Sequence, residues 1–182
     1  MSHKLLDLAL KIEHATAASR ELDAEIMFDL YAKPVGKSNI DGNPAGYLWP
    51  EDNPSWSFSI RFPGKDRAWF ADVRERVDGE TLIIERDGAL VLMNSLRVPP
   101  VTASVDAALA LIPKDWFWRC GRTTLYAGWA FIHRTHPDNC DRKDEFGAGK
   151  EYWRGEWSVP LALCYAAIQA RAALSDTEAR DA

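Results

Sequence analysis

Hydrophobic residues recur at helical spacing in four parts of the chain, including both ends. Leu5, Leu8 and Ile12 lie three or four positions apart, which predicts an amphipathic helix over residues 3–15. The same spacing, each time after a residue suited to capping a helix, predicts three more helices. They begin near Ser19, near Thr102 or Ser104, and near Ser158.

Between the second and third predicted helices, the hydrophobic period changes to two. Residues 56–62 alternate aromatic or aliphatic with polar side chains, which is typical of a strand with one solvated face. Asp78-Gly79 and Asp87-Gly88 are strong two-residue hairpin signals, so an antiparallel meander is expected over about residues 55–97. A further strand pair is predicted over residues 115–121 and 124–134.

The order helix, helix, strands, helix, strands, helix predicts an α+β fold with a largely antiparallel sheet. A chain of 182 residues with 47% hydrophobic residues is expected to form a single domain, residues 1–182, around one core. Within this domain the sequence predicts the meander as an insertion, a long loop at about residues 135–157, and a frayed polar tail at residues 175–182.

Composition narrows the protein class further. The net charge is −5, and no apolar run approaches the roughly 20 residues that a membrane helix requires. Charged residues interrupt the N-terminal stretch, which argues against a secretory leader. Cys120, Cys140 and Cys164 are odd in number and far apart, so free thiols and a cytoplasmic location are expected.

Three stretches together resemble the phage ABA sandwich domain family, small proteins of bacteriophages and prophages. They are RELDAEI at residues 20–26, VTASVDAALALIP at residues 101–113 and VPLALCYAAIQARAAL at residues 159–174. The resemblance implies an alpha-beta-alpha sandwich and a phage or prophage origin, but it brings no activity and no catalytic residues. The meander and the loop at 135–157 depart from the shorter family pattern.

The one concentration of metal-ligand residue types runs from His133 to Glu145. Zinc sites need four ligands, usually with paired spacing, and the offsets of a calcium loop are missing, so neither a metal nor another cofactor is expected. A solvated loop with a strand-end histidine is the preferred interpretation. The weak metal candidates are His133, His136, Asp138 and Asp141.

Two enzymatic alternatives stay open. Asp138, followed by Asp141 and Lys143, superficially resembles the carboxylates and lysine of metal-dependent nucleases, so an enzyme that processes nucleic acid through loop 138–145 is the first alternative. Cys120 and His133 form the one Cys/His couple that the predicted strand pair can bring together, although a packed thiol is expected. No established nucleophile or phosphate-loop motif occurs.

Eight tryptophans suggest a binding surface. Burial is expected for Trp116 and Trp118, and exposure for Trp153 and Trp157, which flank charged residues. Exposed aromatic rings suit a protein partner or a sugar, and a virion or carbohydrate-binding component is the third reading. Cations also accompany aromatic residues over residues 56–76, but the acidic chain argues against nucleic acid as a partner.

The leading hypothesis is a non-enzymatic phage or prophage accessory protein that binds a host or phage protein and modulates a host process. Loops with aromatic and charged residues on a rigid scaffold are typical recognition surfaces, so the contacts are expected in the meander and in loop 135–157. Homo-oligomerisation is compatible with this reading. The candidate partner-binding residues are Asp144, Glu145, Trp153 and Trp157.

Overall fold

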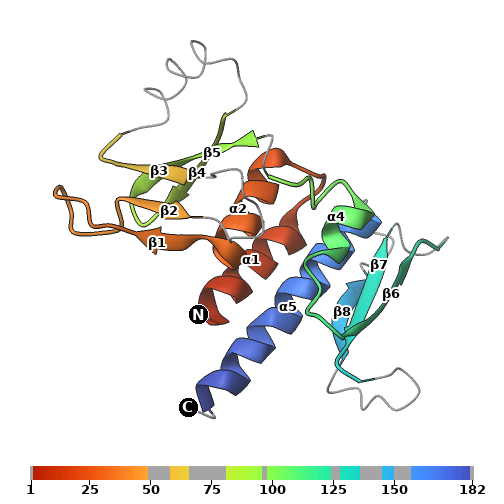
Figure 1. Cartoon of the computed structure of the whole chain (residues 1–182). Helices are drawn as coiled ribbons and strands as arrows, with labels where there is room; N and C mark the ends of the chain where they lie inside the picture. The colour runs from red at the N-terminus through yellow and green to blue at the C-terminus, as the bar shows by residue number, and fades with distance from the viewer. Residues whose placement is uncertain are drawn as a thin grey trace. The chain divides into compact units, whose positions relative to one another are not determined.

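The computed structural model describes residues 2–48, 58–65, 81–95, 98–123, 128–135, 145–149 and 157–180. The chain divides into two compact units (Figure 1): unit 1 comprises residues 1–19 and 100–182, and unit 2 comprises residues 20–99. Each unit combines helices with antiparallel strands, which confirms the α+β fold. In the described part of the chain, no helix is both long and apolar enough to cross a bilayer.

Unit 2 contains helix α2 and a five-stranded antiparallel sheet with the order β1-β2-β3-β5-β4. Because β5 lies between β3 and β4, the described strands do not follow the simple meander order that the sequence predicted. The elements are α2 (Arg20–Tyr31), β1 (Lys33–Val35), β2 (Gly46–Leu48), β3 (Phe58–Pro63), β4 (Thr81–Arg86) and β5 (Ala89–Asn94).

The turn between β4 and β5 confirms one of the two hairpin signals. Asp87 and Gly88 both have positive φ, 50° and 67°, as a type I′ turn requires. The other signal, Asp78-Gly79, and the strand predicted before it lie outside the described residues. The turn aligns Arg86 with Ala89 and so fixes the register of the β4–β5 pair.

The core of unit 2 forms where α2 packs on the sheet. Phe28 meets Tyr47 edge to face, with ring centroids 4.6 Å apart. On α2, Ile26 is fully buried, whereas Leu22 and Leu30 are half-buried. The other buried residues of this core are Ala24, Leu82, Ile84, Val91, Met93 and Val98.

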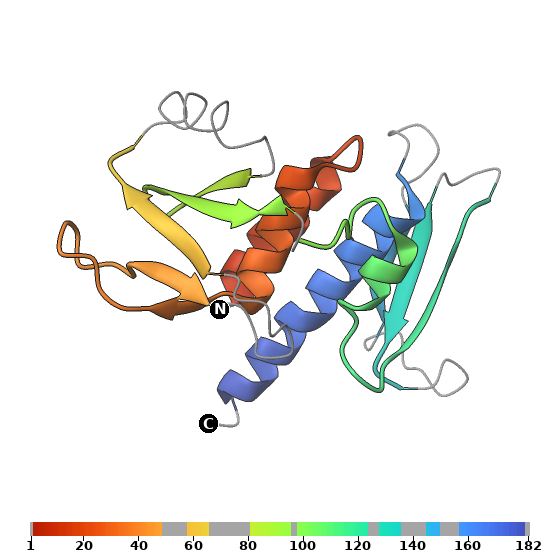
Figure 2. The same ribbon diagram turned by 45° about the horizontal axis from the view of Figure 1, so that its top comes forward.

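Unit 1 is built around helix α5. Its three-stranded antiparallel sheet has the order β6-β7-β8, and α5 packs against β7, β8, α1 and α4. Figure 2 shows α5 running along one face of this sheet. The elements are α1 (Ser2–His14), α4 (Val105–Leu109), β6 (Phe117–Gly121), β7 (Trp129–His133), β8 (Glu145–Gly149) and α5 (Val159–Arg180).

Three predicted irregular segments contain regular structure. Strand β8 lies inside the predicted loop at 135–157, because β7 supplies backbone partners for residues 145–149. The glycines and prolines of residues 35–54 predict a further loop, but this stretch contains the end of β1 and all of β2, which pair as a hairpin. The polar residues after Leu174 continue α5 to Arg180, so the predicted frayed tail is helical as far as the structure describes it.

Candidate functional site

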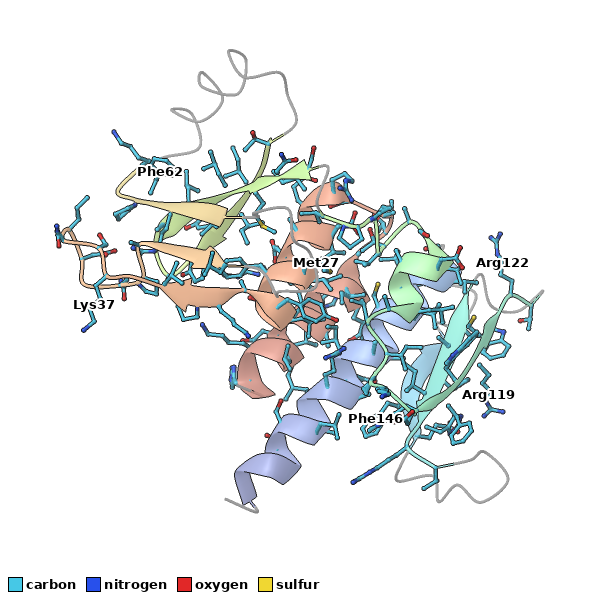
Figure 3. The ribbon with its side chains drawn as sticks, viewed as in Figure 1. Met27, Lys37, Phe62, Arg119, Arg122 and Phe146 are labelled. Carbon is cyan, nitrogen blue, oxygen red and sulfur yellow. The ribbon has the colours of Figure 1, made fainter. Side chains whose placement is uncertain are left out.

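The outer face of the β6-β7-β8 sheet, opposite α5, is the first candidate site. Residues paired across antiparallel strands point to the same side of the sheet. Ala130 and Ile132 are fully buried on the side of α5. The alternate positions form the outer face, and Figure 3 shows Arg119 and Phe146 on opposite sides of the sheet. The outer-face side chains are Phe117, Arg119, Trp129, Phe131, His133 and Glu145.

A stacked guanidinium lies at the centre of this outer face. Arg119 on β6 stands opposite Phe131 on β7, and its guanidinium carbon lies 5.1 Å from the centroid of the Phe131 ring. Arg119 Nη2 donates a hydrogen bond of 3.3 Å to Glu145 Oε2 on β8. The ring of Trp129 lies 5.9 Å from that of Phe131. One cation therefore bridges the three strands.

Glycines make room for the two aromatic rings. A Cβ at Gly121 would lie 3.0 Å from Cζ2 of Trp129, and a Cβ at Gly147 would lie 2.7 Å from Cδ1 of Phe131. In the strand register, Gly121 lies opposite Trp129 and Gly147 lies opposite Phe131. The rings can therefore lie close to the sheet, and the face is flat where side chains would otherwise project.

Of the candidate residues in the described part of the chain, this face brings together His133 and Glu145. His133 Nδ1 lies 3.6 Å from Glu145 Oε2. His133 is the last residue of β7, as expected of a strand-end histidine, and its side chain is buried, with 1% exposed. The strand register places Glu145 directly opposite it, inside the sheet rather than in a loop. The Glu145 carboxylate therefore contacts both Arg119 and His133.

The Cys120–His133 couple does not form. Cys120 is paired with Ala130 and lies on the side of α5, whereas His133 is on the outer face. Burial also raises the pKa of the Cys120 thiol, which reduces the share of reactive thiolate. The packed-thiol interpretation therefore fits this residue.

The remaining metal candidates lie outside the described residues. These are His136, Asp138 and Asp141, together with the partner-binding candidates Asp144 and Trp153. Among the residues that the structure does describe, no group of three or more metal-ligand side chains gathers. The metal-dependent enzyme and the carbohydrate-binding or virion component stay predictions.

Two tryptophan predictions were wrong. Trp157 is 1% exposed, because it precedes α5 and packs against Tyr165 with ring centroids 5.3 Å apart, so it is not an exposed partner-binding residue. Trp118 is 47% exposed instead of buried, because β6 is the edge strand of the sheet. Exposure in both cases depends on where the strand or helix lies in the assembled unit, which residue spacing does not report.

The hairpin tip between β1 and β2, residues 36–45, is a second candidate site, here called the finger. Ile40 lies at its end and is 79% exposed. The Ser38 amide donates to the Asn43 carbonyl at 2.8 Å, and the Gly42 amide donates to the Ser38 carbonyl at 3.0 Å. The Ile40 amide donates to Ser38 Oγ at 3.2 Å. The finger is therefore an ordered turn that presents an apolar side chain to solvent.

A buried arginine fixes the finger to the sheet. The Arg61 side chain is 1% exposed, and its Nη1 lies 2.7 Å from Asp41 Oδ2. Its Nη2 donates to the Asp87 carbonyl at 3.2 Å. Desolvation acts to raise the pKa of Asp41, but hydrogen bonds from Arg61 and Asn43 outweigh it and hold that pKa below its ordinary value. Through these two contacts, Arg61 on β3 links the finger to the β4–β5 turn.

The sequence reading did not single out Ile40. The glycines and prolines of this segment predict a loop. A signal was nevertheless present, since Ile40 stands alone among turn-forming residues, with Ser38 and Asn39 before it and Asp41 and Gly42 after it. An isolated large aliphatic residue in such a turn has no local packing partner in the sequence.

Comparison with known proteins adds no identification. No protein-family model, no curated protein and no solved structure matches the chain significantly. Membership of the phage ABA sandwich family is therefore still a prediction. The class that the fold itself defines is an α+β protein with two antiparallel sheets in its described part.

Proposed function

We propose that the protein is a non-enzymatic accessory protein of a phage or prophage, which binds another protein in the bacterial cytoplasm and modulates a host process. The observation that supports binding is Ile40, held 79% exposed at the end of an ordered finger. The phage origin and the location come from the sequence resemblance and from the composition.

The geometry of the finger favours recognition by insertion. Burying an isoleucine side chain in a partner's apolar pocket contributes roughly 1.5–3 kcal/mol. Binding also costs the entropy of ordering a loop, and a preorganised loop avoids most of that cost. The backbone bonds between Ser38 and Asn43 and the Arg61–Asp41 ion pair supply this order. Ile40 therefore has the properties of an anchor residue.

Charge indicates what surrounds the partner's pocket. Lys33 is exposed beside the finger and Lys37 is exposed within it, and Figure 3 shows the Lys37 side chain pointing away from the loop. Asp41 is ion-paired with Arg61, so its charge is largely compensated. The complementary surface is consequently an apolar pocket with acidic residues at its rim.

A quantitative pull-down from host lysate tests the proposal with a matched pair of variants. Ile40→Asp should reduce the amount of each specifically captured protein by tenfold or more. The reason is that the variant loses roughly the binding energy of one buried aliphatic anchor. Ile40→Val keeps a branched apolar side chain and should retain capture. Circular dichroism establishes that both variants fold. Unchanged capture by Ile40→Asp would refute the finger as the binding site.

A deletion distinguishes the finger from the loop proposed on sequence grounds. The deletion must stop at Asp144, because residues 145–149 form β8 and pair with β7. Removal of residues 138–144 should leave capture intact if the finger carries binding. Loss of capture in this deletion, with none in Ile40→Asp, would return the binding site to the loop that contains Asp144.

A further inference from the structure

We propose that the outer face of the β6-β7-β8 sheet binds single-stranded nucleic acid. This proposal goes beyond protein binding by the finger and concerns a different unit of the chain. At one flat face the structure combines aromatic rings, which can stack on bases, with arginines, which can bind phosphates. Sequence-tolerant binders of single strands use the same two components.

The stacking positions are Phe117 and the Arg119–Phe131 pair. Phe117 is 42% exposed on the edge strand. The Arg119 side chain is 54% exposed, and its planar guanidinium lies over the Phe131 ring. A base can stack on an exposed phenyl ring or on an arginine plane. Gly121 and Gly147 allow the rings of Trp129 and Phe131 to lie close to the sheet on this face.

The charge of the face complements phosphate. Arg119 lies on the face, and Arg122 and Arg134, which follow β6 and β7, are also exposed. Among the described residues of the three strands, Glu145 is the one acidic side chain, and it is bonded to Arg119 and lies beside His133. On the face itself Glu145 partly balances Arg119, and Arg122 and Arg134 add positive charge at the ends of the strands, although the whole chain has a net charge of −5.

These features favour a single strand over other ring-bearing ligands. A duplex keeps its bases stacked on one another, so it offers no base faces to Phe117. A neutral sugar can stack on aromatic rings but gains nothing from three exposed arginines. A single strand uses both, because each nucleotide carries an aromatic face and a phosphate.

Fluorescence anisotropy with labelled oligothymidylate and oligouridylate of about 20 nucleotides tests the proposal on the full chain. We expect saturable binding that weakens with salt, with a log–log slope of about −2 if three phosphates are neutralised. Phe117→Leu should weaken binding about fivefold or more, whereas Phe117→Tyr should retain it. Since Phe117 is partly exposed on an edge strand, both variants should fold.

Arginine variants separate stacking from charge. Arg119→Lys keeps the positive charge but loses the planar stack, so affinity should fall while the salt slope stays the same. Arg122→Gln should reduce the magnitude of the slope by about 0.7. Lys65→Gln removes an exposed cation from unit 2 and should change neither quantity.

Several results would overturn the proposal. The first is the absence of any anisotropy change at about 50 mM salt. The second is equal binding by Phe117→Leu and Phe117→Tyr, and the third is a duplex that competes as strongly as a single strand of the same length. Tryptophan quenching by chitohexaose without any response to oligonucleotides would assign the face to carbohydrate instead. Ile40→Asp should leave oligonucleotide binding unchanged, so failure of the finger proposal and failure of this one are distinguishable.

Discussion

Arg61 and Asp41 join the five-stranded sheet to the tip of the finger through an ion pair of 2.7 Å. The arginine side chain is almost completely buried, and a buried cation is tolerated only when an opposite charge and hydrogen bonds compensate it. Asp41 provides that charge from the tip of the finger. The exposure of Ile40 is therefore tied to a residue in the interior of the sheet.

The first prediction concerns the pH dependence of this pair. The pKa of Asp41 is lowered in the folded state, so the unfolded state binds more protons in acid. Its stabilisation is fully present above the ordinary carboxyl pKa and is lost as the pH falls through the folded-state pKa. Asp41→Asn should therefore be less stable than the parent protein at pH 7, and the two should converge in acid.

Urea unfolding between neutral and strongly acid pH measures this convergence. Glu85→Gln, which changes an exposed carboxylate on β4, is the matched control and should follow the parent protein at every pH. A difference between Asp41→Asn and the parent protein that is independent of pH would contradict the prediction, because it would show that the carboxylate charge is not what holds the finger.

The second prediction concerns Arg86, which connects β4 to α2. Its Nε and Nη2 donate to the two oxygens of Asp29 at 3.0 and 2.9 Å, and Nη2 also donates to Glu25 at 3.3 Å. Burial acts to lower the pKa of Arg86, but both carboxylates outweigh it and raise that pKa. Arg86→Met should lower the free energy of unfolding by about 2–4 kcal/mol, because two half-buried carboxylates lose their cation.

A double variant tests the cause of this loss in urea unfolding. Adding Asp29→Asn to Arg86→Met should recover part of the stability, because one unpaired carboxylate is neutralised. Arg86→Lys keeps the charge without the two-pronged geometry and should fall between Arg86→Met and the parent protein. If the double variant loses as much stability as the two single variants together, the contacts between Arg86 and the carboxylates do not explain the loss in Arg86→Met.

Local signals in the sequence predicted the helices and one turn. The spacing of Leu5, Leu8 and Ile12 gave the position of α1, and Asp87-Gly88 gave the β4–β5 hairpin, because both depend on residues close together in the chain. Ser104 was one of two predicted caps for α4, and its hydroxyl accepts the Ala107 amide in the structure.

Features that depend on distant residues were missed. Strand β8 has the sequence Glu-Phe-Gly-Ala-Gly, whose glycines disfavour a strand, and only pairing with β7 and packing of α5 stabilise it. The position of β5 between β3 and β4 likewise follows from pairing across the sheet. The two candidate sites depend on such distant contacts, since Arg61 orders the finger and strand register aligns Arg119 with Phe131.

The third prediction concerns the cap of α4. Ser104 has an extended backbone and accepts a hydrogen bond from the Ala107 amide at 3.3 Å. Ser104→Ala should lower the free energy of unfolding by about 1 kcal/mol, because an amide at the start of the helix loses its partner. Ser104→Asp can accept the same bond and should retain most of the stability. Equal losses in both variants, measured by urea unfolding, would show that the hydroxyl bond is not what stabilises the helix start.

The last prediction compares two glycines on the outer face. A Cβ at Gly147 would collide with the Ala130 carbonyl oxygen and would lie 2.9 Å from the Phe131 Cα, both of which are backbone atoms in the neighbouring strand. The nearest atoms to a Cβ at Gly121 would belong to the indole ring of Trp129, at 3.0 Å. Because a side chain can shift whereas the paired backbone cannot without breaking the sheet, the two positions should respond unequally.

Gly147→Ala should lower the free energy of unfolding by about 3 kcal/mol, and Gly121→Ala by about 1 kcal/mol or less. Urea unfolding measures both, and tryptophan fluorescence should report the smaller rearrangement, since Trp129 is the group that must move in Gly121→Ala. The order of the two losses is the decisive result. A larger loss in Gly121→Ala would mean that the β7–β8 pairing has more freedom than its register implies, and the flat face required for stacking would then lack its rigid support.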